Sequence, residues 1–305
     1  MRVAVIGLGV QGRKRAAVAG PDVVATVDPV VPDARYRAID EVPSEAYDAA
    51  LVCTPDHAKL ELMTGLLSRG KHVLVEKPLL AADEATIQAL EAAARATGTA
   101  CYTAYNHRFE PHLARAKALL DEGVVGAVYL VRGFYGNGTA QDVKRSPWRD
   151  DGPGALSDLG SHLLDLIHWM FGEPEGRFHI WSARSFETRA HDHVLFGSDG
   201  TPAIQLEVSL VSWRNTFALD VFGDQGSLHV HGLCKWGPSR LILRRRVLPS
   251  GKPQEEARTL EQPDPTWELE YQHFNALCRD GGTNLANDIW MNRMLHELGG
   301  VALLK

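Results

Sequence analysis

Cysteine is scarce in this chain of 305 residues, and its four cysteines lie far apart without forming a Cys-x-x-Cys pair. A disulfide framework or a zinc knuckle needs closely spaced cysteines, so neither is expected, and no metal site is predicted. Free cysteines are typical of a reducing compartment, which makes a cytoplasmic location the default expectation.

Long apolar runs are also missing. The most apolar stretch, residues 163–171, contains Asp165 and His168 and is far shorter than the roughly 20 residues that span a bilayer. The apolar residues after Met1 give way to glycine too early for a signal peptide. No membrane partner is therefore expected.

Positive charge is not in excess, because 32 Lys and Arg residues face 38 Asp and Glu residues, for a net charge of -6. A protein that neutralises nucleic-acid phosphates normally shows a basic excess or stripe. The one basic run, residues 244–246, lies in a strand-like segment and is interpreted as an exposed sheet edge. A nucleic-acid partner is therefore not expected.

The composition is otherwise that of a globular protein, with 45% hydrophobic residues, and the length predicts about two domains. In the first half, apolar runs of strand length alternate with helical patterns. Strands are predicted at residues 3–6, 23–27, 49–54, 72–75 and 99–105, and helices at 13–19, 57–69 and 83–97. This alternation predicts a doubly wound parallel α/β sheet of the Rossmann type. Prolines between residues 28 and 49 predict a shortened crossover there.

The second half changes character after a predicted helix at residues 111–120. A strand at 128–135 and a long helix at 153–171 precede several strand-like runs, at residues 178–186, 192–197, 203–211, 216–222, 227–231 and 241–248. Helices at 267–278 and 284–298 follow. The pattern predicts a second α/β domain with a mostly antiparallel open sheet. We place the domain boundary between residues 120 and 121, giving domains 1–120 and 121–305.

A glycine-rich loop is the first chemical signal. Gly7, Gly9 and Gly12 form a G-x-G-x-x-G motif between a predicted strand and a predicted helix, with Val10 and Gln11 inside it. Glycine permits the tight turn, and the helix start offers free N–H groups to a pyrophosphate. Asp28 ends the next strand, 16 residues past Gly12, where a carboxylate accepts hydrogen bonds from the adenosine ribose. Its charge would repel a 2′-phosphate, so NAD is favoured over NADP. A glycine turn without a ligand is the alternative.

The end of a later strand carries Glu76-Lys77-Pro78. Ligands of open α/β sheets bind outside the carboxyl ends of the strands, where Lys77 is expected. Pro78 restricts the preceding residue to extended geometry and so directs the lysine side chain. A lysine near a cofactor can exchange protons with a substrate hydroxyl. The alternative is a surface lysine paired with Glu76.

The long helix of the second half carries two stripes. Its apolar stripe is expected to face the core and consists of Leu156, Leu159, Leu163, Ile167 and Met170. A polar stripe places Asp158 and His162 four residues apart, on one helical face. A carboxylate beside an imidazole suits proton exchange near neutral pH. The alternative is an acid at a helix start and an incidental histidine.

Several motifs in order resemble those of one family. They are the glycine loop, Thr54-Pro55-Asp56-His57, Glu76-Lys77-Pro78, Tyr105-Asn106-His107-Arg108-Phe109-x-Pro111, and Gly152-x-Gly154-x-x-x-Asp158-x-Gly160-x-His162-x-x-Asp165. Together they resemble the glucose-fructose oxidoreductase / inositol dehydrogenase / MocA (Gfo/Idh/MocA) family over nearly the whole chain. The resemblance implies a nicotinamide-dependent oxidoreductase whose second domain often forms oligomer contacts through its open sheet. By this resemblance, the catalytic lysine of the family corresponds to Lys77, and the family's aspartate–histidine pair corresponds to Asp158 and His162.

The family's substrates, mainly sugars, inositols and sugar nucleotides, imply a small sugar-like substrate here, and a homo-oligomer is expected. The expected cofactor contacts are Gly7, Gly9, Val10, Gln11, Gly12, Asp28, Thr54, Pro55, His57, Glu76 and Lys77. The expected substrate contacts are Asn106, Arg108, Arg145, Trp148, Arg149, Asp158 and His162. Arginine suits phosphate or carboxylate, and tryptophan suits the apolar face of a sugar ring. The alternative is that residues 134–151 form a solvated loop without substrate contacts. The segment after Asp28 is shorter than the family pattern.

The sequence thus predicts an NAD-dependent dehydrogenase that acts on a CH–OH group, with Lys77 and His162 handling the proton. Other functions remain open. One is a glycosidase that uses NAD for transient oxidation and elimination, and another is a regulator that binds dinucleotide without chemistry. Reduction of a linear tetrapyrrole or an imine fits the aspartate–histidine pair less well.

Overall fold

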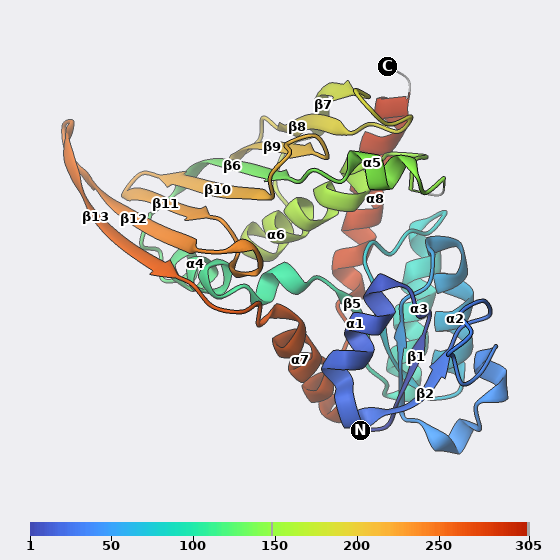
Figure 1. Ribbon diagram of the computed structural model, residues 1–305. Coiled ribbons are helices and arrows are strands. Elements are labelled where there is room, and N and C mark those ends of the chain that lie inside the picture. Colours follow the sequence, from blue (N-terminus) through green and yellow to red (C-terminus); the bar gives the residue numbers. More distant parts are fainter. Residues whose placement is uncertain (148, 304–305) are drawn as a thin grey trace. The chain divides into compact units, whose positions relative to one another are not determined.

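The computed structural model describes residues 1–147 and 149–303. The chain forms two compact units (Figure 1). The N-terminal unit consists of Met1–Asn106 and Thr266–Asn292, and the C-terminal unit consists of His107–Pro265 and the chain from Arg293 onward. The chain thus leaves the N-terminal unit, returns to it and leaves it again. The boundary between residues 120 and 121 stays a prediction about the domains.

The N-terminal unit is built on a parallel sheet of five strands in the order β2-β1-β3-β4-β5, which confirms the doubly wound arrangement. The strands are β1 (Val3–Ile6), β2 (Val23–Val27), β3 (Ala49–Val52), β4 (His72–Glu76) and β5 (Cys101–Ala104). All residues of β1, β3 and β5 are buried, as continuous apolar runs of parallel sheets usually are. The strand order reverses at β1, so the carboxyl ends of β1 and β3 lie at the topological switch point, where such sheets bind ligands.

Helices connect these strands. They are α1 (Val10–Ala19), α2 (Asp56–Ser68) and α3 (Glu84–Thr97), and α7 (Thr266–Asp280) packs against α1 from far along the chain. Between β2 and β3 the chain makes only two short 3-10 turns, Ile39–Glu41 and Ser44–Ala46. The prolines of this segment therefore shorten the crossover as predicted.

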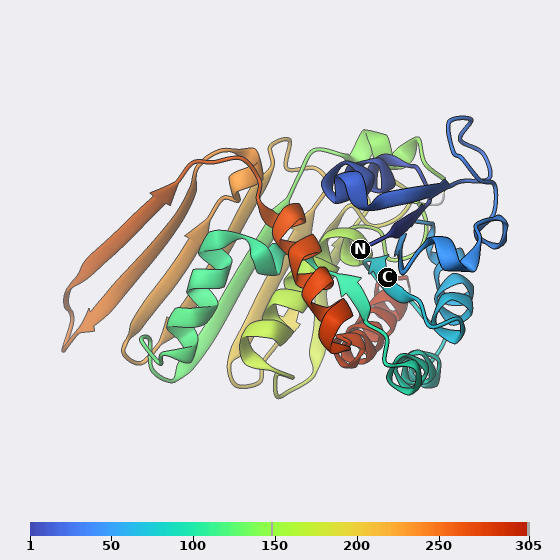
Figure 2. The same cartoon turned by 90° about the horizontal axis from the view of Figure 1, so that it is seen from below.

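The C-terminal unit is built on an eight-stranded sheet in the order β13-β12-β11-β10-β6-β9-β8-β7 (Figure 2). Its strands are β6 (Val128–Gly136), β7 (Phe178–Arg184), β8 (His193–Ser198), β9 (Ala203–Ser209), β10 (Thr216–Gly223), β11 (Gly226–His231), β12 (Ser239–Val247) and β13 (Gly251–Leu260). All neighbours are antiparallel except β6 and β9. The mostly antiparallel second sheet is therefore confirmed.

The helices of this unit are α4 (Pro111–Asp121), α5 (Ala140–Lys144) and α6 (Ser161–Phe171), and α8 (Leu285–Leu303) begins in the N-terminal unit and ends in this one. Figure 2 shows α4 and α6 lying along one face of the sheet. The predicted apolar stripe of residues 156–170 is buried, which confirms that it faces the core. In the part of the chain that the structure describes, no helix combines the length and apolarity of a membrane span.

Two expectations about this unit are wrong, and two of its elements were not predicted. The strand β13 was not predicted, because nearly all its residues are exposed and show no apolar alternation. As β13 covers the sheet edge, the basic run at 244–246 is not an edge, and Arg244 and Arg245 instead form ion pairs with Glu255 and Glu256 of β13. The predicted helix at 153–171 begins as a π-helical turn, Leu156–Gly160, before α6 starts. The short helix α5 was also not predicted.

Glu110 links the start of α4 to the 3-10 turn Cys234–Trp236 between β11 and β12. Its buried carboxylate accepts hydrogen bonds from the backbone N–H groups of His112 and Leu113 at 2.8 and 3.0 Å. The other carboxylate oxygen accepts from the Cys234 backbone N–H at 3.3 Å and its thiol at 3.1 Å. One side chain thus caps a helix and anchors a loop.

We expect Glu110→Ala to lower the free energy of unfolding by about 2 kcal/mol, because buried N–H donors lose their acceptor. Urea denaturation followed by circular dichroism measures this loss. Glu110→Gln is the control, since it keeps one acceptor oxygen and should lose clearly less. Equal losses in the two variants would contradict the capping role.

Candidate active site

The glycine loop between β1 and α1 needs glycine for steric reasons at two of its three glycine positions. Gly7 has a φ of 89°, and a Cβ on it would lie 2.6 Å from the Cys53 carbonyl oxygen. A Cβ on Gly12 would overlap the Gly7 carbonyl oxygen, whereas a Cβ on Gly9 would meet nothing within 4 Å. Two glycines therefore allow the loop to close on itself, and Gly9 borders open space.

That open space lies at the start of α1. Gly9, Val10 and Gln11 are exposed, and 84% of Val10 is accessible to solvent. The helix has no side-chain cap at its N-terminus and no acidic residue in its first turn. Its first N–H groups and the positive end of its dipole therefore suit an anionic ligand, as a dinucleotide pyrophosphate requires.

Asp28 has a structural role that the sequence did not reveal. One of its carboxylate oxygens accepts a hydrogen bond of 2.8 Å from the backbone N–H of Leu8 in the glycine loop. The other accepts hydrogen bonds of 2.9 Å from the backbone N–H groups of Val30 and Val31. Burial alone would raise the pKa of this carboxyl, but the three backbone donors and Arg37 lower it below its ordinary value. Asp28 therefore carries a negative charge at the end of β2 and ties the loop to that strand. Its contact with ribose stays a prediction.

The other expected cofactor residues also follow strand ends of the N-terminal unit. Thr54 is half-buried just after β3, Pro55 precedes α2, and His57 is exposed in the first turn of that helix. Glu76 ends β4, and Lys77 follows it, half-buried, with a cis peptide bond to Pro78. Because neighbouring parallel strands end at one edge of a sheet, these residues share the edge that carries the glycine loop.

Glu76 is bound by a buried arginine. Arg15 of α1 is 1% exposed, and its guanidinium lies 2.7 Å from Glu76 Oε1 and 2.7 Å from Glu270 Oε2 of α7. The ring of Trp267 lies 4.3 Å from the same guanidinium. Burial opposes the charge of Arg15, but the two carboxylates outweigh it and raise its pKa. The arginine therefore holds the residue that directly precedes Lys77.

In the C-terminal unit, His162 lies in α6 within a cluster of rings. It is buried, and the ring of His107 stacks on it with centroids 4.0 Å apart and an interplanar angle of 19°. Tyr135 of β6 packs edge-on at 5.8 Å. Lys235 lies 3.2 Å from His107 Nε2 and 3.3 Å from the Tyr135 hydroxyl. An ammonium group donates, so that nitrogen of His107 accepts.

Sequence reasoning missed His107, Tyr135 and Lys235 as neighbours of His162. His107 stands inside the Tyr105–Pro111 motif, which was a usable signal. Lys235 lies 73 residues beyond His162 in a loop that no motif marks, so only folding could place it here. Burial and the nearby negative charge of Asp158 raise the pKa of Tyr135, which keeps its hydroxyl protonated as a hydrogen-bond donor.

Asp158 lies in the π-helical turn, so the regular helical spacing assumed between Asp158 and His162 does not apply there. Its carboxylate lies 3.1 Å from the Arg149 guanidinium. This ion pair brings together two residues that were expected to contact substrate. Direct orientation of His162 by Asp158 stays a prediction.

The remaining expected substrate residues have varied surroundings. Arg108 forms a two-point ion pair with the fully buried Asp165, at 2.9 and 2.5 Å, which supports α6. The side-chain amide of Asn106 donates to the Thr266 hydroxyl at 2.8 Å within the N-terminal unit. Arg145 is exposed and lies 3.7 Å from Asp142. Trp148 lies outside the described residues. Substrate contacts of all four stay predictions, as does the meeting of Lys77 with His162, which belong to different units.

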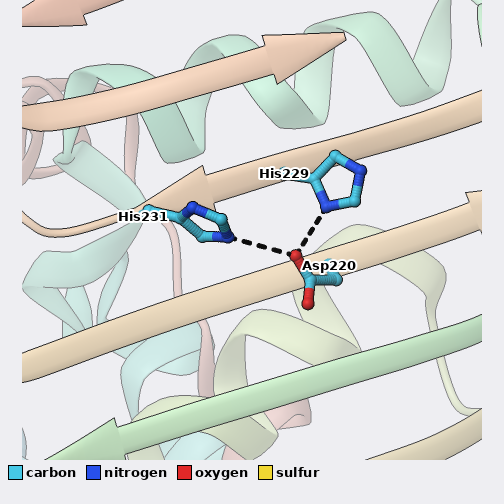
Figure 3. Close-up of side chains that lie close together, drawn as sticks. All are labelled: Asp220, His229 and His231. Atoms are coloured by element: carbon cyan, nitrogen blue, oxygen red, sulfur yellow. Dashed lines mark hydrogen bonds and ion pairs between the residues drawn. The ribbon is translucent and has the colours of Figure 1, made fainter. Parts of the chain in front are cut away.

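One cluster on the second sheet has the composition of a metal site. Across residues 1–147 and 149–303, Asp220, His229 and His231 are the one group of three such ligands placed close together (Figure 3). His229 Nδ1 lies 2.6 Å from Asp220, and His229 Nε2 lies 3.0 Å from the Arg244 guanidinium. Because a guanidinium only donates, Nε2 accepts and Nδ1 donates to Asp220. Arg132 also donates to Asp220 at 3.2 Å, so two arginines would repel a cation. The cluster is a hydrogen-bonded network of the sheet.

Comparison with known families gives a match in each unit. Residues 1–105 match the family described as "Oxidoreductase family, NAD-binding Rossmann fold", and residues 113–229 match the "GFO/IDH/MocA C-terminal domain". The cofactor that the glycine loop fits is therefore NAD. Together the two matches cover most of the chain.

Curated relatives include scyllo-inositol 2-dehydrogenase (NAD(+)) of Bacillus subtilis, 27% identical over 95% of this chain and 89% of the relative. Levoglucosan dehydrogenase of Pseudarthrobacter phenanthrenivorans is 32% identical, but the match covers 40% of this chain and only 32% of that protein. A solved structure of levoglucosan dehydrogenase with NADH superposes with a TM-score of 0.83 at 18% identity, covering 99% of this chain and 97% of that one. At that identity the likeness shows the fold alone.

We expect Gly9→Ala to weaken NADH binding about tenfold, because its methyl group would occupy the space that the pyrophosphate needs, while the fold stays intact. Titration of NADH fluorescence measures the affinity. Gly65→Ala in α2 is the control, since a Cβ there also meets nothing within 4 Å, and its affinity should match wild type. Unchanged binding by Gly9→Ala would contradict the placement of the cofactor.

Proposed function

Because the chain belongs to the Gfo/Idh/MocA oxidoreductase family, we propose that it transfers a hydride between NAD and a secondary alcohol or ketone of a sugar, a cyclitol or a sugar nucleotide. One observation supports this proposal above all. The uncapped start of α1, which suits a pyrophosphate, lies at the same edge of the N-terminal sheet as the half-buried Lys77. The ring cluster around His162 supplies the second proton-exchanging group in the other unit.

NAD is held by the glycine loop in this proposal. The backbone N–H groups of residues 9–12 bind the pyrophosphate. Asp28 accepts hydrogen bonds from the adenosine ribose through those lone pairs of its carboxylate that the backbone N–H groups do not use. The negative charge of Asp28 disfavours a 2′-phosphate, and hence NADP. The other cofactor contacts are Thr54, Pro55, His57, Glu76 and Lys77. Bound NAD supplies the hydride acceptor.

Oxidation of an alcohol removes a hydride from carbon and a proton from oxygen, and the chain's own side chains must handle the proton. Lys77 and His162 contact the reacting oxygen, where one donates a hydrogen bond and the other accepts the proton. The ring of His107 fixes the plane of His162, and the ion pair of Asp158 with Arg149 places a carboxylate and a guanidinium nearby. In the reductive direction the same groups return the proton to the carbonyl oxygen.

Most substrate contacts come from the C-terminal unit in this proposal. Arg149 and Arg145 suit a phosphate or carboxylate of the substrate. Asn106 of the N-terminal unit and Arg108 are proposed to contact nicotinamide or substrate. A homo-oligomer through the open sheet and a cytoplasmic location also stay predictions. Relatives that act on scyllo-inositol and on glucose 6-phosphate support a polyhydroxylated ring as substrate.

We expect Lys77→Met to reduce turnover by about a thousandfold while leaving NADH affinity within about twofold of wild type, because proton exchange is lost, whereas Lys77 is only one of many proposed NAD contacts. NADH absorbance measures turnover with levoglucosan, scyllo-inositol or glucose 6-phosphate, whichever of these is oxidised fastest. His162→Asn should behave in the same way. A Lys77→Met variant that turns over at the wild-type rate would remove the proposed role of this lysine.

A further inference from the structure

The turn between β11 and β12 reaches the ring cluster of His162 from a neighbouring part of the same sheet. β6, which carries Tyr135 near its carboxyl end, is antiparallel to β10, and β10 is antiparallel to β11. The carboxyl ends of β6 and β11 therefore lie at one end of the sheet. The 3-10 turn Cys234–Trp236 follows β11 and places Lys235 and Trp236 at that end.

Contacts on both sides hold this turn in place. Glu110 anchors it through a backbone N–H and a thiol, as described above. The Nζ of Lys235 lies 3.2 Å from His107 Nε2 and 3.3 Å from the Tyr135 hydroxyl. The rings of His107 and Tyr135 both contact the ring of His162, with centroid distances of 4.0 and 5.8 Å. One ammonium group is thus fixed to two rings that contact the histidine proposed to exchange the proton.

The side chains of Lys235 and Trp236 suit two parts of one ligand. Both residues are partly exposed, and the Lys235 ammonium lies 4.4 Å from the centroid of the Trp236 ring. The apolar face of a tryptophan packs against the C–H groups of a sugar ring. An ammonium group forms strong hydrogen bonds with carboxylates and phosphates. The two acceptors named above, an imidazole nitrogen and a phenol oxygen, are uncharged, so neither neutralises the ammonium.

We propose that Lys235 and Trp236 form a specificity subsite that selects a polyhydroxylated ring bearing a carboxylate or a phosphate. The ring lies against Trp236, its anionic group binds the Lys235 ammonium, and the carbon to be oxidised lies at His162. The inference rests on the proposed function, because it takes His162 to contact the substrate. It narrows the substrate class from sugars and cyclitols in general to acidic ones.

A purely structural role for Lys235 makes a different prediction. In that case its ammonium only ties the turn to the two rings, and its loss weakens the binding of neutral and anionic rings alike. The ratio of the two affinities therefore separates the two roles. Lys117 of α4 offers a matched control in the same unit, because it is also partly exposed and its ammonium pairs with Asp121 of its own helix at 2.5 Å.

The first test measures binding without turnover, by isothermal titration calorimetry of the full chain in the presence of NADH. Glucose, glucuronate and glucose 6-phosphate are the probes, because they share one ring and differ in the group at its sixth carbon. We expect at least one anionic probe to bind wild type about tenfold more tightly than glucose, and the tighter one shows whether a carboxylate or a phosphate is preferred. If neither binds more tightly than glucose, the proposal is overturned.

Substitution of Lys235 tests whether its charge causes this preference. Lys235→Met should bring the ratio of anionic to neutral affinity close to one, while Lys117→Met keeps the wild-type ratio. Lys235→Arg retains the charge and should keep the ratio within about threefold of wild type. Lys235→Gln retains a donor without the charge and should also lose the preference, which decides the matter if Lys235→Met does not fold. A wild-type ratio in Lys235→Met or Lys235→Gln would overturn the role of the lysine.

Substitution of Trp236 tests the second part of the subsite. Trp236→Ala should weaken the binding of all three probes about fivefold without changing the ratio of their affinities, because the apolar surface serves the ring that they share. Trp236→Phe retains an aromatic face and should recover most of the affinity. Wild-type affinities in Trp236→Ala would remove the tryptophan from the subsite.

The binding measurements also separate this inference from the proposed function. If Lys77→Met is inactive but wild type shows no preference for an anionic ring, this inference alone fails. If Lys77→Met retains wild-type turnover, the proposed catalysis fails, while the ratio of affinities still decides whether Lys235 selects an anionic ring.

Discussion

The buried guanidinium of Arg15 is the interaction on which the N-terminal unit most depends. A charge that is 1% exposed is tolerated only with close partners, and Arg15 has Glu76 from β4 and Glu270 from α7. Because Glu270 lies in α7, this ion pair needs residues 266–280 to fold with the N-terminal unit, although they follow the second sheet in the sequence. It also fixes the end of β4, where Lys77 follows. One ion network therefore couples the completion of the fold to the placement of the candidate catalytic lysine.

The cofactor loop depends on a second constraint, which is steric. Side chains at Gly7 or Gly12 would collide with backbone, so the loop can fold back tightly only with glycine at both positions. The charge of Asp28 then holds the Leu8 N–H from the neighbouring strand. The result is a rigid loop next to an uncapped helix start, which needs little rearrangement to receive a pyrophosphate. Binding is favoured because the loop is ordered before the ligand arrives.

Much of the fold was predictable because it is encoded in local patterns. The strands of the first sheet are short apolar runs, and glycine or proline follows β1 to β4 within three residues. The helices have apolar residues at helical spacing. The strand β13 could not be predicted, since its exposed polar residues pair only through backbone hydrogen bonds to β12 and ion pairs such as Arg244 with Glu255. The π-helical turn before α6 was equally hidden, because its residues have the same spacing as an ordinary helix.

For the candidate site, the sequence alone determined which residue types stand at strand and helix ends: the glycine loop, Asp28, Lys77 and His162. These follow from neighbours within a few positions, so a single sequence carries the signal. Only the tertiary structure decided which partner each side chain has, such as Lys235 beside the rings at His162 or Glu270 beside the buried Arg15. Such partners come from segments distant in the chain. Leaving a buried polar group without a partner is energetically costly, so the fold that pairs these groups is favoured.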